Sequence, residues 1–326
     1  MTTIIYYPYT ELDHLETVPN ELVLADHLNG FDQCLRNQHL DRLNNYAISQ
    51  NTLYRVLTWQ PVSLEIKKNY SNIKFITSQS IFNSGCNWNQ FVEYTQHPNL
   101  DYKNFVCSFN GAPHASRKLL LAILNQFKLI NPGYVSKNFT FTAEEVDGYI
   151  QDEFAESSRL YRKFFISDHS NDFFNRVISL DYDIDTILYK HNANIHRLEK
   201  IITESFVHLV SESIGTSYYP SVTEKFLYSV ITRGLFVTYG QPGWHSYIEK
   251  NYGFRKYDKI FDYRFDSIVN PIERLIELIS MLHKFKFLSI DDWKDLYNME
   301  QDTIEYNYHH YHSGDYRRHF LNLVDE

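Results

Sequence analysis

Two cationic side chains stand in the first turns of two predicted helices. Arg117 follows the stretch FVCSFNGAPHAS, and Lys225 follows SVTE. A cation at the start of a helix opposes the helix dipole, but it is favourable where an anion such as a diphosphate binds. The planar guanidinium of arginine can donate hydrogen bonds to two oxygens at once, and the lysine ammonium is a compact positive charge. The two cations predict a phosphate-binding site; a solvent-exposed or surface-paired Arg117 is the alternative.

Several carboxylates could work beside these cations. Glu224 is suited to bind ligand hydroxyl groups, or it forms a capping box with Ser221 and serves only the helix. Asp26 follows a predicted strand, where a general base would stand; the alternative is a solvated loop residue. Asp183 and Asp185 form part of two overlapping D-x-D patterns, which could hold a divalent cation against a diphosphate or form an acidic loop.

The histidines and cysteines give weaker indications. Four of the 15 histidines lie in the C-terminal tail, but no matching cysteine or carboxylate set accompanies them, so we predict no metal site. The tail histidines are His309, His310, His312 and His319. The three cysteines are widely spaced and form no CxxC pair, which is typical of buried thiols in a reducing compartment. We expect no cofactor.

Strand–loop–helix units position both cations. Short apolar runs predict buried strands at 105–109, 206–210 and 235–239. Helices are predicted at 114–127 and 221–234, each after a strand and a polar loop. This pattern indicates an α/β fold in which helix N-termini lie at the carboxyl ends of strands, where open α/β sheets bind ligands.

The remaining chain is predicted mainly from apolar periodicity. Residues 1–100 resemble a small α/β unit, with strands at 3–7, 22–25 and 74–77 and a helix within 31–46. Further helices are predicted at 142–165, 192–204, 245–252 and 271–285, and one or two more in 290–326. The helix at 271–285 carries proline at its start.

Composition narrows the classes of function. The chain has 326 residues, 43% hydrophobic residues and a formal net charge of −9. That charge argues against electrostatic binding of nucleic acid. The longest apolar run, 119–124, is far shorter than the roughly 20 residues of a membrane helix, and the N-terminus does not resemble a signal peptide. We therefore expect a cytoplasmic protein.

The sequence contains no GxGxxG, GxxxxGK[ST] or GxSxG motif, which disfavours a simple Rossmann dehydrogenase, a P-loop enzyme and an ordinary serine hydrolase.

Together, the segments FVCSFNGAPHASRKLLLAIL, FVHLVSES and SVTEKFLYSVITRGLFVTYGQPG resemble the donor domain of the α1,3-fucosyltransferase family, in a divergent form closer to viral and bacterial chains. The resemblance covers residues 104–245. It implies a GT-B architecture, in which two Rossmann-like domains face each other. It also implies a nucleotide-sugar donor, with GDP-sugars favoured.

The resemblance assigns roles to individual residues. Arg117 matches the family arginine that contacts the donor diphosphate, and Lys225 matches the lysine that binds the phosphates. Glu224 matches the glutamate that hydrogen-bonds to donor hydroxyls. Glu212 matches the acidic residue at the end of the preceding strand. Gly240 ends the next strand in Tyr-Gly and joins the predicted substrate-binding set. The chain departs from the family at Ser221, where the family has tyrosine, and at Ser213, where it has asparagine. Tyr219, beside Tyr218, is our predicted substitute for the missing tyrosine.

We therefore predict a donor-binding domain at 101–295, an N-terminal acceptor-side α/β domain at 1–100, and a C-terminal helical tail at 296–326. The expected reaction is inverting, metal-independent transfer of a sugar to a hydroxyl acceptor such as a glycan. Asp26 is the predicted catalytic base, and His114 is a weaker candidate. Three alternatives stay open: a metal-dependent GT-A transferase using Asp183 and Asp185, a catalytically inactive transferase-like protein, and transfer to a modified DNA base.

Overall fold

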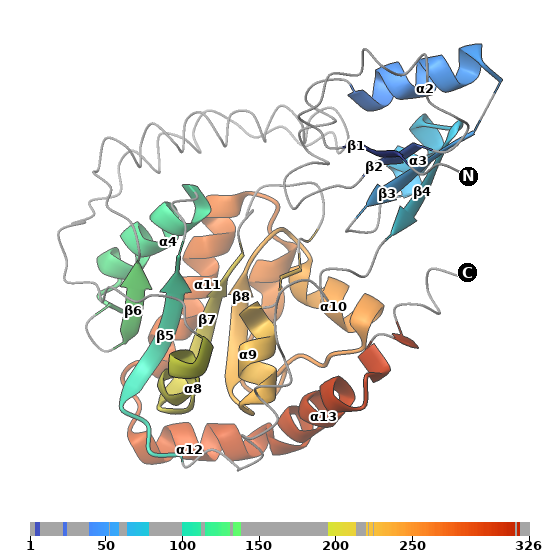
Figure 1. Ribbon diagram of the computed structural model, residues 1–326. Helices are drawn as coiled ribbons and strands as arrows, with labels where there is room; N and C mark the ends of the chain where they lie inside the picture. The colour runs from blue at the N-terminus through green and yellow to red at the C-terminus, as the bar shows by residue number, and fades with distance from the viewer. Residues whose placement is uncertain are drawn as a thin grey trace.

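A four-stranded parallel sheet forms the centre of the structure, a computed structural model (Figure 1). Its strands are β5 (Asn104–Asn110), β6 (Tyr134–Lys137), β7 (Ser205–Ser211) and β8 (Leu235–Tyr239), and their order in the sheet is β6-β5-β7-β8. All neighbouring strands pair in parallel. The predicted α/β class and three of these strands are confirmed. The short strand β6, with its mixed sequence YVSK, was not predicted.

The structure describes residues 4–6, 22–24, 39–51, 53–58, 64–77, 100–111, 115–130, 133–137, 195–212, 220, 222–223, 225–316 and 318–319. The predicted helix at 142–165 and the D-x-D patterns around residue 183 lie outside these ranges.

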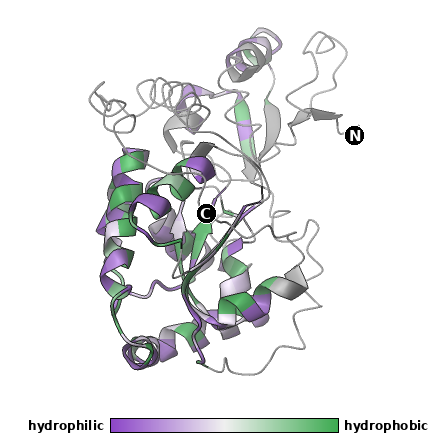
Figure 2. Cartoon of the chain, turned by 90° about the vertical axis from the view of Figure 1, so that its left-hand side faces the viewer, coloured by the Kyte–Doolittle hydropathy of each residue, from purple (hydrophilic) through white to green (hydrophobic). Residues whose placement is uncertain are grey.

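Helices cover both faces of the sheet. Helices α4 (Ala115–Gln126) and α11 (Pro271–Phe285) pack against each other on one face, and α8 (Ile195–Thr203) and α9 (Lys225–Ile231) pack together on the other (Figure 1). Figure 2 shows hydrophobic and hydrophilic residues mixed along the helices. Buried and partly exposed positions alternate along α11, as expected when one stripe faces a core, whereas every residue of α9 after Lys225 is buried. Helix α11 has the predicted bounds, because Asn270 caps its first turn by accepting hydrogen bonds from the N–H groups of Ile272 and Glu273.

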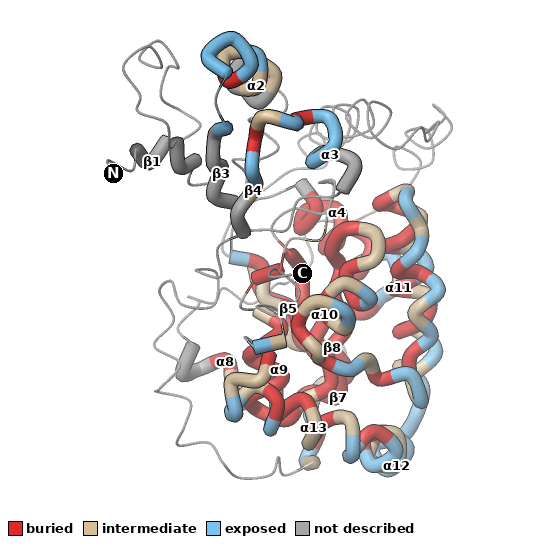
Figure 3. Tube along the Cα trace, turned by 90° about the vertical axis from the view of Figure 1, so that its right-hand side faces the viewer, coloured by how far each residue is buried: buried red, intermediate tan, exposed pale blue. Residues whose placement is uncertain are grey.

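The core lies between the sheet and these helices. Every residue of β7 and β8 is buried, whereas exposed positions gather on α12 (Ile290–Met299) and the outer side of α11 (Figure 3). Aromatic rings extend the core to α12: the Trp293 ring stacks on Phe206 with centroids 5.6 Å apart, and the Trp293 indole N–H donates to Phe285 O. Burying rings of this size supplies much of the hydrophobic free energy of such a core.

Helix α13 (Gln301–His312) packs against α9, beside the central sheet. Arg233, in the turn after α9, forms an ion pair with Glu305 at 2.9 Å, and its guanidinium lies 3.4 Å from the centroid of the Tyr308 ring. The described part of the predicted tail therefore shares the core of the central sheet.

The N-terminal region contains two smaller parallel pairs of strands. β1 (Ile4–Tyr6) pairs with β2 (Leu22–Leu24), and β3 (Tyr54–Thr58) pairs with β4 (Ile73–Thr77). Helices α2 (His39–Ser49) and α3 (Leu64–Asn69) accompany them, apart from the central sheet (Figure 1). The predicted strands at 3–7, 22–25 and 74–77 are confirmed; β3, which Arg55 interrupts with a charge, was not predicted.

Candidate functional site

The strand order of the central sheet makes the carboxyl ends of two neighbouring strands a candidate ligand-binding position. From β5 the chain crosses to β6 on one side, whereas β7 and then β8 lie on the other side. The order therefore reverses between β5 and β7. In open α/β sheets, ligands bind outside the carboxyl ends of the strands at such a switch point. We define the switch-point edge as the carboxyl ends of β5 and β7, with the first turn of α4 and the segment leading into α9.

A buried hydrogen-bond network occupies the β7 side of the switch-point edge. Glu212 follows β7 and is fully buried; Oε1 accepts from the Thr223 N–H at 3.1 Å, and Oε2 accepts from the Thr223 hydroxyl at 2.6 Å. The Lys225 ammonium donates to the same hydroxyl oxygen, Thr223 Oγ1, at 3.0 Å. Lys225 is half-buried and is the first residue of α9. The network thus joins the end of a strand to the cation that the sequence predicted as a phosphate ligand.

The β5 side contributes a second buried polar group. Asn110 ends β5, and its Nδ2 donates to Ser136 O at 3.2 Å. Cys107 aligns with His208 in the parallel register, so Asn110 and Ser211 end their strands at the same level.

Arg117 and Ser116, in the first turn of α4, are both buried. Within the described part of the chain, Asn110 Oδ1, Ser116 Oγ and Ser211 Oγ have no hydrogen-bond partner. These atoms give the switch-point edge unused hydrogen-bonding capacity.

Gly240, immediately after β8, has a packing role beside the switch-point edge. A Cβ added there would lie 2.8 Å from Trp244 Cδ1 and 3.5 Å from Glu212 Cγ. The carbonyl oxygen of Gly240 accepts from Nε of the buried Arg274, whose Nη1 donates to two further carbonyl oxygens of the segment before α11. A glycine at this position lets the chain pass close to the Trp244 ring. Its predicted contact with substrate stays a prediction.

The structure brings four predicted site residues to neighbouring strand ends and helix starts: Arg117, Glu212, Lys225 and Gly240. Asp26, Tyr219, Glu224 and His114 lie outside the described residues. The sequence interpretation missed Thr223, although it sits inside the quoted T-E-K triplet. Asn110, Ser116 and Ser211 were also missed; the available signal was a polar residue at the end of an apolar run or at the start of a helix.

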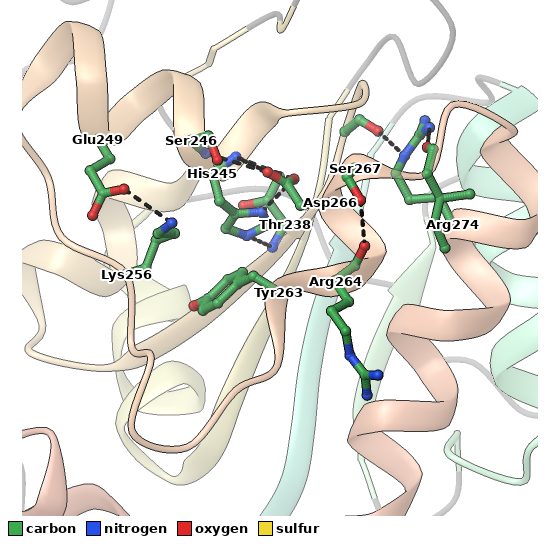
Figure 4. A network of polar contacts seen from close by, with 12 residues as sticks. Thr238, His245, Ser246, Glu249, Lys256, Tyr263, Arg264, Asp266, Ser267 and Arg274 are labelled. Carbon is green, nitrogen blue, oxygen red and sulfur yellow. Dashed lines mark hydrogen bonds and ion pairs between the residues drawn. The ribbon is translucent and has the colours of Figure 1, made fainter.

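An aspartate–histidine pair elsewhere in the fold resembles part of a catalytic triad but serves a structural purpose. His245 Nδ1 lies 2.9 Å from Asp266 Oδ1, and its Nε2 accepts from the Thr238 N–H at 3.0 Å (Figure 4). Because Nε2 accepts, Nδ1 carries the proton and donates to Asp266. Both ring nitrogens are engaged inside the core, so this histidine cannot accept a proton from a substrate.

The carboxylate of Asp266 also anchors the start of α10 (Trp244–Tyr252). It accepts from the N–H groups of His245 and Ser246 (Figure 4). The Asp266 main-chain oxygen accepts from the Gly243 N–H. Burial favours the neutral acid, but the interaction with His245 and these hydrogen bonds outweigh it and hold the pKa of Asp266 below its usual value. The pair ties the 3₁₀ helix η5 (Tyr263–Ser267) to α10.

Two kinds of site are absent from the described residues. No group of three or more His, Cys, Asp or Glu side chains there could hold a metal ion. No helix in that part of the chain combines the length and apolar character needed to span a bilayer.

No protein-family model, curated protein or solved structure matches this chain.

Proposed function

We propose that the chain is a glycosyltransferase that takes a sugar from a nucleoside-diphosphate donor, with a GDP-sugar favoured, and transfers it to a hydroxyl acceptor. One observation carries the proposal. Two buried or half-buried cations, Arg117 and Lys225, come from separate strand–helix units, and both stand at the switch point of a parallel sheet. This is where open α/β sheets bind nucleotides.

The chemistry of the reaction needs such cations. Cleavage of the anomeric bond leaves negative charge on the diphosphate, and fixed positive groups at that position stabilise the transition state more than the ground state. The planar guanidinium of Arg117 suits bidentate contact with two phosphate oxygens. Lys225, held by the Thr223 hydroxyl, supplies a point charge. No metal is needed for this step in the proposed mechanism.

The unpartnered atoms at the switch-point edge support a sugar nucleotide as the ligand. Asn110 Oδ1 can accept a hydrogen bond, and the hydroxyls of Ser116 and Ser211 can donate or accept. Such groups suit a ligand that carries both hydroxyls and phosphate oxygens.

The acceptor side of the proposal rests on the N-terminal α/β unit. A GT-B enzyme places its acceptor and general base on a second Rossmann-like domain, and the parallel pairs β1–β2 and β3–β4 would belong to it. Asp26 is the proposed base. An inverting displacement would then pass through an oxocarbenium-like state while the base takes the proton of the acceptor hydroxyl.

Nucleotide binding tests the proposal directly. Wild-type protein is titrated with GDP, UDP, CDP, ADP and dTDP by calorimetry, with and without EDTA. Each site variant is paired with an exposed residue of the same type: Arg117→Ala with Arg264→Ala, and Lys225→Ala with Lys200→Ala. The Arg264 and Lys200 side chains are 87% and 77% exposed. We expect one diphosphate to bind in EDTA, and each site variant to lose at least about tenfold in affinity while each control stays within twofold.

Other outcomes point to the alternatives. Binding that disappears in EDTA would favour the metal-dependent transferase using Asp183 and Asp185. Binding without hydrolysis or transfer of the matching sugar nucleotide would favour an inactive transferase-like protein. Absence of binding to all five diphosphates, or unchanged binding in both site variants, would refute the site.

A further inference from the structure

We propose that Thr223 is the positioning residue of this site: its hydroxyl transmits the charge and orientation of Glu212 to the Lys225 ammonium. The inference rests on the proposed function, because the cation is positioned for a diphosphate. It goes further by naming a residue with no charge of its own as a determinant of phosphate affinity.

The direction of each hydrogen bond follows from the chemistry of the groups. A lysine ammonium can only donate, so Thr223 Oγ1 must accept from Lys225 Nζ across their 3.0 Å separation. The single hydroxyl proton of Thr223 is then available for Glu212 Oε2, 2.6 Å away. A short distance of this kind is typical of a hydroxyl donating to a carboxylate. The result is a chain of two charge-assisted hydrogen bonds from cation to carboxylate.

The network is also fixed in space. Glu212 Oε1 accepts the main-chain N–H of Thr223 at 3.1 Å, so the carboxyl group holds both the backbone and the side chain of Thr223. Glu212 and Thr223 are buried, at 0% and 1% exposure. The Glu212 N–H donates to Tyr239 O, which continues the ladder between β7 and β8. The position of the Lys225 ammonium is therefore fixed relative to the sheet through the hydroxyl oxygen of Thr223.

This arrangement explains why a glutamate is buried behind the cation. Its two oxygens face Thr223, so Glu212 acts on a bound anion through Thr223 and Lys225. The carboxylate offsets the cost of holding an ammonium in a half-buried position. The Thr223 hydroxyl lies between the two charges, so the sequence of hydrogen bonds from the ammonium to the carboxylate runs through its oxygen.

A double-mutant cycle with Thr223→Val and Lys225→Ala tests the inference. Valine keeps the branched shape and removes the hydroxyl, and Thr223→Ser restores the hydroxyl without the methyl group. The dissociation constant is measured by calorimetry for GDP, with UDP, CDP, ADP and dTDP in parallel. Urea unfolding without nucleotide checks that each variant is folded.

We expect Thr223→Val to weaken binding about tenfold and Thr223→Ser to remain within about twofold of wild type. In the Lys225→Ala background, Thr223→Val should cause no further loss, because the hydroxyl then has no cation to position. A purely structural role would give equal losses in both backgrounds and no rescue by serine. Should the valine variant fail to fold, Glu212→Gln replaces it, and we expect the same loss and the same dependence on Lys225.

The experiment distinguishes failure of this inference from failure of the proposed function. Wild-type binding that depends on Lys225 but is unchanged in Thr223→Val would overturn this inference and leave the proposed function intact. Equal losses in both backgrounds would do the same. Wild-type protein that binds none of the five diphosphates would overturn the proposed function and this inference together.

Discussion

Replacing Gly240 by alanine should destabilise the protein, although the change adds only one methyl group. The added Cβ would lie 2.8 Å from Trp244 Cδ1 and 3.1 Å from Trp244 Cγ, closer than carbon atoms normally approach. The tryptophan has no room to yield, because it is fully buried and packs edge to face on the Phe226 ring at 5.5 Å. The strain must therefore be distributed into the backbone at the end of β8.

The magnitude follows from two opposing effects. Overpacking a rigid core by one methyl group costs about 1–3 kcal/mol. Replacing glycine by alanine also restricts the unfolded chain, which stabilises the protein by about 0.4–1 kcal/mol where the native backbone permits. The net expectation for Gly240→Ala is a loss of about 1.5 kcal/mol in the free energy of unfolding.

Gly111→Ala supplies a matched control. Gly111 is exposed, and a Cβ built there meets no heavy atom within 4 Å. Only the effect on the unfolded chain applies, so this variant should be neutral or more stable by up to about 1 kcal/mol. Urea unfolding of wild type and both variants gives the two differences in the free energy of unfolding, provided that the m-values are equal. Equal stability of the two variants would refute the packing role assigned to Gly240.

Two further predictions concern buried ionisable groups. Burial lowers the pKa of His208 from 6.5 to about 3, so the unfolded state binds the proton first as pH falls. Wild type should therefore lose on the order of 1 kcal/mol of unfolding free energy between pH 7.5 and 5.5 through this group, and His208→Gln should lack that component in urea unfolding measured at both pH values. Asp266→Asn should cost about 2–3 kcal/mol, because its charged hydrogen bonds to buried His245 and the start of α10 are weakened. The exposed N-cap variant Asp262→Asn should cost clearly less than Asp266→Asn in the same assay, and equal losses would contradict the role given to Asp266.

Local sequence signals predicted the parts of the fold that depend on local interactions. The apolar runs of β7 and β8 identify strands that are buried on both faces. Pro271 predicted the start of α11, and the Asn270 cap found there is likewise a contact within one turn. Strands β3 and β6 were missed because charged or polar residues interrupt their apolar runs, YRVLT and YVSK.

The candidate site was predictable only in part, for a similar reason. Arg117 and Lys225 could be found because a cation at the start of a helix is unusual in itself. The link from Glu212 to Thr223 spans eleven residues and depends on where a strand ends and the next helix segment begins. The close approach of Gly240 to Trp244 likewise depends on how the chain turns after β8. Neither relationship has a local sequence pattern.

The unpartnered atoms at the switch-point edge bear on function independently of any resemblance. A buried polar atom without a hydrogen-bond partner destabilises a fold by about 1–3 kcal/mol, so stability within the described chain does not explain the hydroxyls of Ser116 and Ser211. Asn110 differs, because its Nδ2 donates to Ser136 O and only its Oδ1 atom lacks a partner. Alanine at Ser116 or Ser211 would avoid that cost. Functional sites commonly retain polar groups that folding alone would disfavour. Because these atoms lie on the edge that also holds Arg117 and Lys225, they support the polar, phosphate-bearing ligand that we propose.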